Sequence, residues 1–155
     1  LWQFAVSENE QLRNAALVAL AHKQDQSVGE FARDILRRGA FKPTVSEVLG
    51  LLTNNYKPED SNLIISTLSK IQPDAISAHS LGLSILDIFD VNQPPELLEA
   101  LKWVYEIGPC TLCRMYAVKH MRALRQIESE IVEECLNDAN EDIQRIAREL
   151  RGVGK

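Results

Sequence analysis

Two cysteines separated by two residues form the short motif with the clearest capacity for chemistry. Cys110 and Cys113 follow Gly108 and Pro109, which favour the start of a helix. A helix dipole stabilises a thiolate in the first turn, so a CxxC pair at that place can support redox chemistry. Redox pairs usually follow a strand, whereas this pair follows a helical pattern that contains Trp103. The favoured interpretation is therefore a packing role for Cys113, and a redox role stays open.

The histidines and the third cysteine complete no recognised metal pattern. Possible zinc ligands are Cys110, Cys113, His120 and Cys135. Their spacing matches no closed structural zinc site well. His22 and His79 have no cysteine or carboxylate at ligand spacing, so we interpret both as surface or helix-end residues. The sequence assigns no metal ligand, no cofactor and no catalytic residue.

Composition and motifs exclude several classes of function. The chain has 155 residues and a net charge of −5, which argues against a general nucleic-acid binder. Its apolar runs are too short for a membrane span. Three cysteines do not make a disulfide framework, so a reducing, cytoplasmic location is expected. Nucleophile-elbow, P-loop and dinucleotide-binding patterns do not occur in the sequence.

Charged residues gather in two segments near the C-terminus. The acidic run contains Glu128, Glu130, Glu133, Glu134, Asp138, Glu141 and Asp142, and the basic segment contains Arg114, Lys119, Arg122 and Arg125. We interpret both as solvated faces or as pairs with neighbouring helices. The alternatives are an acidic edge that attracts a basic partner and a basic strip that touches phosphate.

The elements that must position these residues are all expected to be helices, because apolar residues recur at helical spacing throughout. The six prolines, Pro43 among them, fall between the periodic segments, where they do not interrupt a helix. The expected helices span 9–22, 27–38, 44–54, 58–71, 75–89, 94–107, 111–126, 129–138 and 141–151. No strand is expected.

Helix ends are marked by capping signals. Ser27 with Glu30 suggests a capping box, and Asn140 precedes the acidic start of the last helix. Arg37 is followed by a second arginine and then by Gly39, which is typical of a helix C-terminus.

Two interleaved series of residues repeat at nearly constant intervals. The small-residue series is Ala16, Gly50, Ser84, Ala117 and Ala147, at intervals of 34, 34, 33 and 30 residues. The large-residue series is Phe31, Ile64, Leu97 and Ile131, at intervals of 33, 33 and 34 residues. Such periods predict stacked helical hairpins, with small residues where the first helices of successive hairpins cross. Larger apolar residues beside each small one are expected to fill the layer: Ala15, Leu49, Leu83, Tyr116 and Ile146 before it, and Leu17, Leu51, Ile85 and Val118 after it.

The pattern resembles the HEAT and HEAT-like helical repeats, including the shorter bilin-lyase type. The segments that carry the resemblance are 12–17 (LRNAAL), 113–118 (CRMYAV) and 143–147 (IQRIA). Glu47 and Leu81 depart from it, because they stand where such repeats have arginine. The resemblance implies an all-α fold, an α-solenoid of about four and a half antiparallel helical hairpins. Residues 1–155 form a single HEAT-like repeat domain in this interpretation, expected to be a fragment of a longer chain.

The resemblance also implies a non-catalytic module that binds a protein partner on a concave face. The second helix of each hairpin would supply that face. The candidate contact residues are Glu30, Arg33, Asp34, Arg37, Ser66, Lys70, Glu99, Lys102, Trp103, Glu130, Glu133 and Asn137. Trp103 lies roughly opposite the apolar stripe of its own helix, so it is either an anchor for the partner or a residue that a neighbouring hairpin covers. The oligomeric state stays open.

Three other functions remain open at this point. They are a subunit of a bilin or chromophore lyase, a HEAT-like DNA-repair glycosylase, and a structural spacer in a longer chain. The negative charge and the lack of a continuous basic groove count against the glycosylase.

Overall fold

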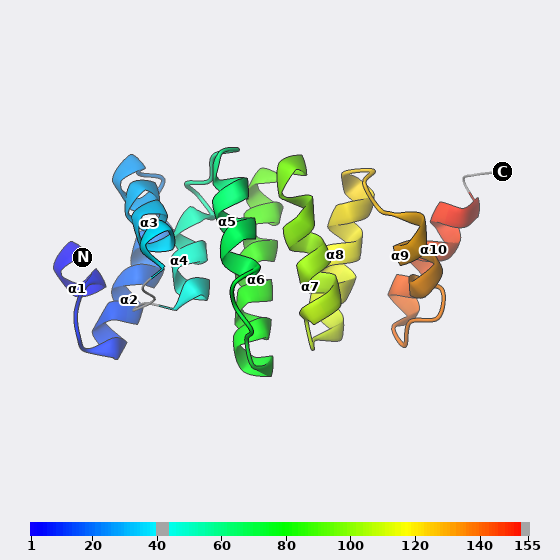
Figure 1. Ribbon diagram of the computed structural model, residues 1–155, viewed down its shortest axis with the longest axis horizontal. Helices are drawn as coiled ribbons and strands as arrows, with labels where there is room; N and C mark the ends of the chain where they lie inside the picture. The colour runs from blue at the N-terminus through cyan, green and yellow to red at the C-terminus, as the bar shows by residue number, and fades with distance from the viewer. Residues whose placement is uncertain (40–43, 153–155) are drawn as a thin grey trace.

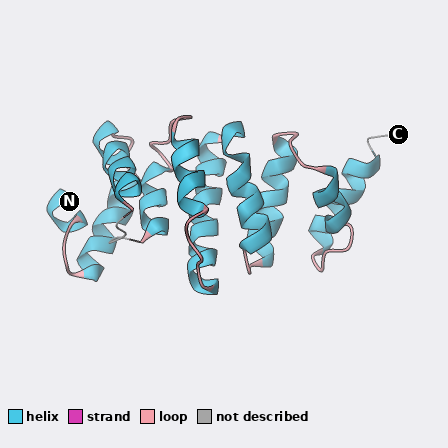
Figure 2. Ribbon diagram, in the orientation of Figure 1, coloured by secondary structure: helices cyan, strands magenta, loops and turns pink. Residues whose placement is uncertain are grey.

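The computed structural model describes residues 1–39 and 44–152, and over these residues the protein is all-α (Figure 2). It has ten α-helices, one 3-10 helix and no strand in the described ranges. The helices are α1 (Trp2–Ala5), α2 (Glu10–Ala21), α3 (Gln26–Arg38), α4 (Val45–Leu52), α5 (Asp60–Leu68), α6 (Ala75–Asn92), α7 (Leu98–Ile107), α8 (Thr111–Ala123), α9 (Ser129–Cys135) and α10 (Glu141–Gly152), with the 3-10 helix η1 (Pro95–Leu97) before α7.

The helical pattern of the sequence is confirmed, with changes at the ends of elements. Each of the nine expected helices corresponds to one of α2 to α10. The sixth expected helix starts as the 3-10 helix η1, whose first residue is Pro95. The short α1 was not predicted, and Pro43 lies outside the described residues.

The helices form two rows along the long axis of the molecule (Figure 1). In one row α2 packs on α4, α4 on α6, α6 on α8 and α8 on α10. In the other row α3 packs on α5, and α5 on α7. The rows interlock, because α3 also packs on α4, and α7 packs on both α6 and α8. We call the row of α3, α5, α7 and α9 the second-helix row.

The core lies between the two rows and contains most of both residue series. Ala16, Ala117 and Ala147 of the small-residue series are buried. Ser84 is half-buried, and its hydroxyl donates a hydrogen bond to the carbonyl of Ser46 on the neighbouring α4 at 2.9 Å. In the large-residue series Ile64, Leu97 and Ile131 are buried, and Phe31 is half-buried against the core.

Larger residues flank the small-residue series, and the expectation that they are buried holds for those after it but not for all of those before it. Those after it, Leu17, Leu51, Ile85 and Val118, are all buried. On the other side Leu49 and Ile146 are buried, but Leu83 and Tyr116 are each 46% exposed and Ala15 is exposed. The expectation was wrong for these three. Neighbouring residues on a helix point about 100° apart, and at these positions the residue before the small one points towards solvent.

The helix ends follow the capping signals with one exception. Asn140 accepts hydrogen bonds from the backbone N–H groups of Asp142 and Ile143, and Gly39 ends α3 with a φ of 66°. The capping box at Ser27 was wrong. Asp25 is the N-cap of α3 instead, since its carboxylate accepts the backbone N–H of Ser27 at 2.9 Å. No helix in the described ranges combines the length and the apolar character that a membrane crossing needs.

Candidate functional site

The expected contact residues lie on the second-helix row or directly after its helices. Seven of them are exposed: Glu30, Arg37, Lys70, Glu99, Glu130, Glu133 and Asn137. Asp34, Ser66, Lys102 and Trp103 are half-buried. Arg33 is buried, with 7% of its surface exposed, and its guanidinium is therefore not offered to a partner.

Trp103 faces a hollow between α5 and α7. The hollow measures about 210 Å³, and its lining joins apolar and polar side chains of both helices. The apolar lining comes from Ile65, Leu68 and Trp103, and the polar lining from Ser69, Glu99, Lys102 and Glu106. Because the hollow is small, open and amphipathic, its dimensions suit one or two side chains of a docked segment.

Lys102 is neutralised at the rim of this hollow. Its ammonium lies 2.9 Å from a carboxylate oxygen of Glu99 and also contacts Glu128. Hydrogen bonds to these two carboxylates, chiefly that of Glu128, raise the pKa of Lys102. With Glu106 exposed on the same rim, the hollow has an acidic character.

Arg33 holds two elements of the second-helix row together. Its guanidinium donates to both carboxylate oxygens of Asp60, at 2.6 and 2.8 Å, and to the carbonyl of Asn55 at 2.7 Å. Gly29 makes room for it, because a Cβ at that position would lie 2.6 Å from an Arg33 nitrogen. Arg33 is thus an internal bridge between α3 and α5.

The charged segments near the C-terminus pair across helices. Arg114 of α8 lies 2.8 Å from Asp138, and Arg122 lies 2.6 Å from Glu149 of α10. Lys119 lies over the ring of Tyr116, 5.0 Å from its centroid. Three of the four residues of the basic segment therefore already contact a partner within the chain.

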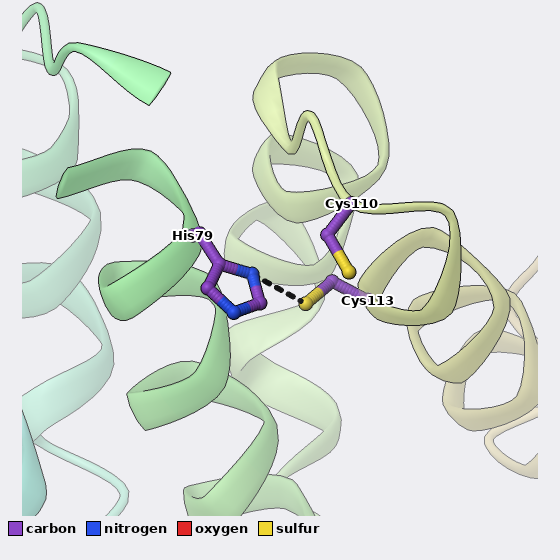
Figure 3. A group of neighbouring side chains, drawn as sticks. All are labelled: His79, Cys110 and Cys113. Atoms are coloured by element: carbon purple, nitrogen blue, oxygen red, sulfur yellow. Dashed lines mark hydrogen bonds between the residues drawn. The ribbon is translucent and has the colours of Figure 1, made fainter. Parts of the chain in front are cut away.

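A second group of side chains meets between α6 and α8. His79 of α6, Cys110 directly before α8, and Cys113 in the first turn of α8 converge on one point (Figure 3). The Nδ1 atom of His79 lies 3.5 Å from the sulfur of Cys113, and the ligand atoms of all three residues lie within 4.8 Å of one another. Cys113 is buried, and the other two are half-buried.

Local backbone geometry places the two sulfurs together. Cys110 is the N-cap of α8, with extended backbone angles, so its side chain folds back over the first turn towards Cys113. The backbone N–H of Cys113 stabilises the thiolate and lowers the pKa of Cys110. Burial raises the pKa of Cys113 to about 11.

The other zinc candidates lie elsewhere. The thiol of Cys135 donates to the hydroxyl oxygen of Tyr105 at 3.8 Å. His120 lies 3.1 Å from a carboxylate oxygen of Asp90, and burial lowers its pKa. Spacing along the sequence did not reveal His79, but the repeat period carries a signal. His79 and Cys113 are 34 residues apart, which places them on adjacent helices of one row.

A further hollow of about 700 Å³ lies between α4 and α6, lined in part by Val45, Ile76 and Leu81. None of the expected contact residues lines it.

Comparisons with known proteins do not identify a family for this chain. No family model, no curated protein and no solved structure matches it.

Proposed function

We propose that the chain is a HEAT-like α-solenoid that binds a protein partner on its second-helix row, without catalysis. The single observation that carries this proposal is the amphipathic hollow at Trp103. Two rows of helices, with most members of both residue series buried between them, support the repeat architecture. In such an architecture one row forms an extended inner surface, and α3, α5, α7 and α9 would supply it.

The proposed partner is an extended segment with an aromatic or branched apolar residue beside a lysine or arginine. Trp103, Ile65 and Leu68 would receive the apolar side chain. Glu106 would receive the cation, since Lys102 is already neutralised by Glu99 and Glu128. The exposed Glu130 of α9 would add to the acidic character of this row and speed association with a basic partner, whereas Glu133 is paired with Arg151 at 3.2 Å.

A peptide-display selection on the immobilised chain tests this proposal. We expect enrichment of sequences with an apolar residue next to a basic one. Trp103→Ala and Glu106→Lys should each weaken the selected peptides at least about 30-fold, as expected for a central anchor contributing 2 kcal/mol or more. Tyr116→Ala is the matched control, because Tyr116 is an exposed aromatic residue of the other row.

Thermal unfolding of each variant shows whether the fold is intact before binding is compared. Glu106→Lys changes an exposed side chain, so it tests the hollow even if Trp103→Ala is destabilised. Peptides that bind Glu106→Lys and Trp103→Ala as tightly as the natural chain, or that are lost in Tyr116→Ala, would contradict the proposed face.

A further inference from the structure

We propose that His79, Cys110 and Cys113 form a zinc site that clamps α6 to α8. Two sulfurs and the Nδ1 atom of the histidine would be the protein ligands, and a solvent molecule would occupy the fourth position. This inference does not depend on the proposed function, because the cluster lies away from the hollow at Trp103 and shares no residue with it.

The distance between His79 Nδ1 and Cys113 Sγ closely matches one edge of a tetrahedral zinc site. With Zn–S of about 2.3 Å and Zn–N of about 2.0 Å, a tetrahedral site separates sulfur from nitrogen by about 3.5 Å and sulfur from sulfur by about 3.8 Å. The separation between Cys113 and His79 is 3.5 Å, and the widest pair in the cluster is within 4.8 Å. A small rotation of the half-buried Cys110 side chain would close the remaining difference.

The chemistry of the ligand set selects the class of metal. Two thiolates and one imidazole favour zinc over calcium or magnesium, which prefer oxygen ligands. The cluster contains no carboxylate. Because His79 and Cys110 are half-buried rather than enclosed, solvent can reach the fourth position.

The helices that carry His79 and Cys113 pack against each other. Cys113 lies on α8 and His79 on α6. Gly82, one turn after His79, lies close to α8, since a Cβ there would be 4.0 Å from the Cβ of Cys113. A metal at this place would join two successive first helices and so stabilise the junction between their hairpins.

Metal titration of the reduced, metal-free chain tests the proposal. We expect one Zn²⁺ per chain and an upward shift of the thermal unfolding midpoint on binding. Co²⁺ used as a probe should give the absorption of thiolate-to-cobalt charge transfer together with the visible bands of a tetrahedral ion. Zn²⁺ should then displace it.

Cys110→Ser is the most informative variant, because serine is a good N-cap and the helix should keep its start. We expect Cys110→Ser and His79→Gln to bind Zn²⁺ more than about 100-fold more weakly, since replacing an outer-shell partner alone costs up to that factor. Cys135→Ala and His22→Gln are matched controls, in which a thiol or an imidazole outside the cluster is removed. Both should bind Zn²⁺ as the natural chain does.

Several outcomes would overturn the site. They are the absence of tetrahedral thiolate bands with Co²⁺, an equal loss of binding in Cys135→Ala, and one zinc shared by two chains. A chain that forms a Cys110–Cys113 disulfide but retains no metal when reduced would also overturn it, and would favour a redox dithiol instead.

Discussion

The ion pair between Arg33 and Asp60 shows how strongly a single buried charge is constrained in this fold. The two side chains are only 8% and 3% exposed, and they are joined by two hydrogen bonds. Asp60 also accepts the backbone N–H of Lys57, and Arg33 also donates to the carbonyl of Asn55. The hydrogen bond to Asp60 raises the pKa of Arg33, so the guanidinium stays charged. Removing one partner therefore leaves a buried charge without compensation.

We expect Asp60→Ala to lower the free energy of unfolding by about 3–5 kcal/mol, the usual cost of breaking a buried pair. Urea denaturation measures it. The double variant Arg33→Met with Asp60→Leu should recover most of that loss, because no buried charge remains. Asp34→Ala is the control and should cost about 0.5 kcal/mol or less, since its pair with Arg38 is exposed. Equal losses of unfolding free energy in Asp60→Ala and Asp34→Ala would show that the buried pair contributes no more to stability than the exposed pair.

The resemblance to HEAT-like repeats placed Arg33 on the binding face, because it assigns that face to the second helix of each hairpin. Periodicity identifies which residues lie on a helix, but it does not identify a partner 27 residues away on another helix. The same limit applies to His79. Its neighbour Cys113 is distant in sequence, and only the stacking of α6 on α8 brings them together. Long-range pairs of single residues are thus the part of the site that a sequence leaves unspecified.

At the level of single helices, a carboxylate that caps a helix start makes part of the free energy of unfolding depend on pH. Asp74 caps α6 by accepting the backbone N–H of Ser77 at 2.8 Å, and this bond lowers the pKa of Asp74 below its ordinary value. A carboxyl group with a lowered pKa stabilises the fold above its ordinary pKa of about 3.9. That stabilisation is lost as the pH falls through the lower pKa of the folded state.

We expect Asp74→Asn to make stability less dependent on pH below about pH 4, because asparagine caps a helix without ionising. Urea midpoints of the variant and the natural chain, followed from neutral to acidic pH, measure the difference. Glu141→Gln is a control for removal of an acidic side chain at another helix start, since Asn140 and not Glu141 accepts the cap hydrogen bonds of α10. If Asp74→Asn leaves the acid profile unchanged, the cap of α6 is not a source of the pH dependence.

Two glycines at helix contacts should respond in opposite directions to alanine. A Cβ at Gly82 would meet its nearest neighbour, Val104, at 3.6 Å, an ordinary contact. At Gly108 it would lie 2.4 Å from the carbonyl oxygen of Val104. We expect Gly82→Ala to gain about 0.5–1 kcal/mol from helix propensity and Gly108→Ala to lose about 1–3 kcal/mol from the clash. Denaturant unfolding distinguishes them, and a loss in both would mean that α6 packs more tightly on α7 and α8 than these distances indicate.

The sequence predicted the helices better than it predicted contacts between distant residues. Prolines, N-caps and helical periodicity act locally, so α2 to α10 were all recognisable. The N-cap of a helix was harder to predict where two polar residues could each serve as the cap, as Asp25 and Ser27 could at α3. Asp25 prevails because its extended backbone leaves the carboxylate free to accept the N–H of Ser27.

At the scale of the whole molecule, contacts between helices are mostly between neighbours along the rows. The interior helices α4 to α7 are packed on both sides, whereas over the described residues the main contacts of α10 are with α8 and α9. The C-terminal pair depends on a few links, among them Arg114. This residue lies over the ring of Tyr105, 4.9 Å from its centroid, and pairs with the buried Asp138. Because most contacts join neighbouring helices, local opening should start at an end, where fewer contacts hold a helix in place.

Hydrogen exchange should therefore show strongest protection in α4 to α7 and weaker protection in α9 and α10. We expect Arg114→Met to speed exchange in α9 and α10, at a cost of about 1–3 kcal/mol, because it leaves Asp138 buried without its cation. Exchange in α3 to α5 should not change. Arg122→Met is the matched control on the same helix and should have little effect, since its pair with Glu149 is exposed on both sides. If Arg114→Met speeds exchange equally in every helix, the chain opens as one cooperative unit, and its stability is not a sum over neighbouring interfaces.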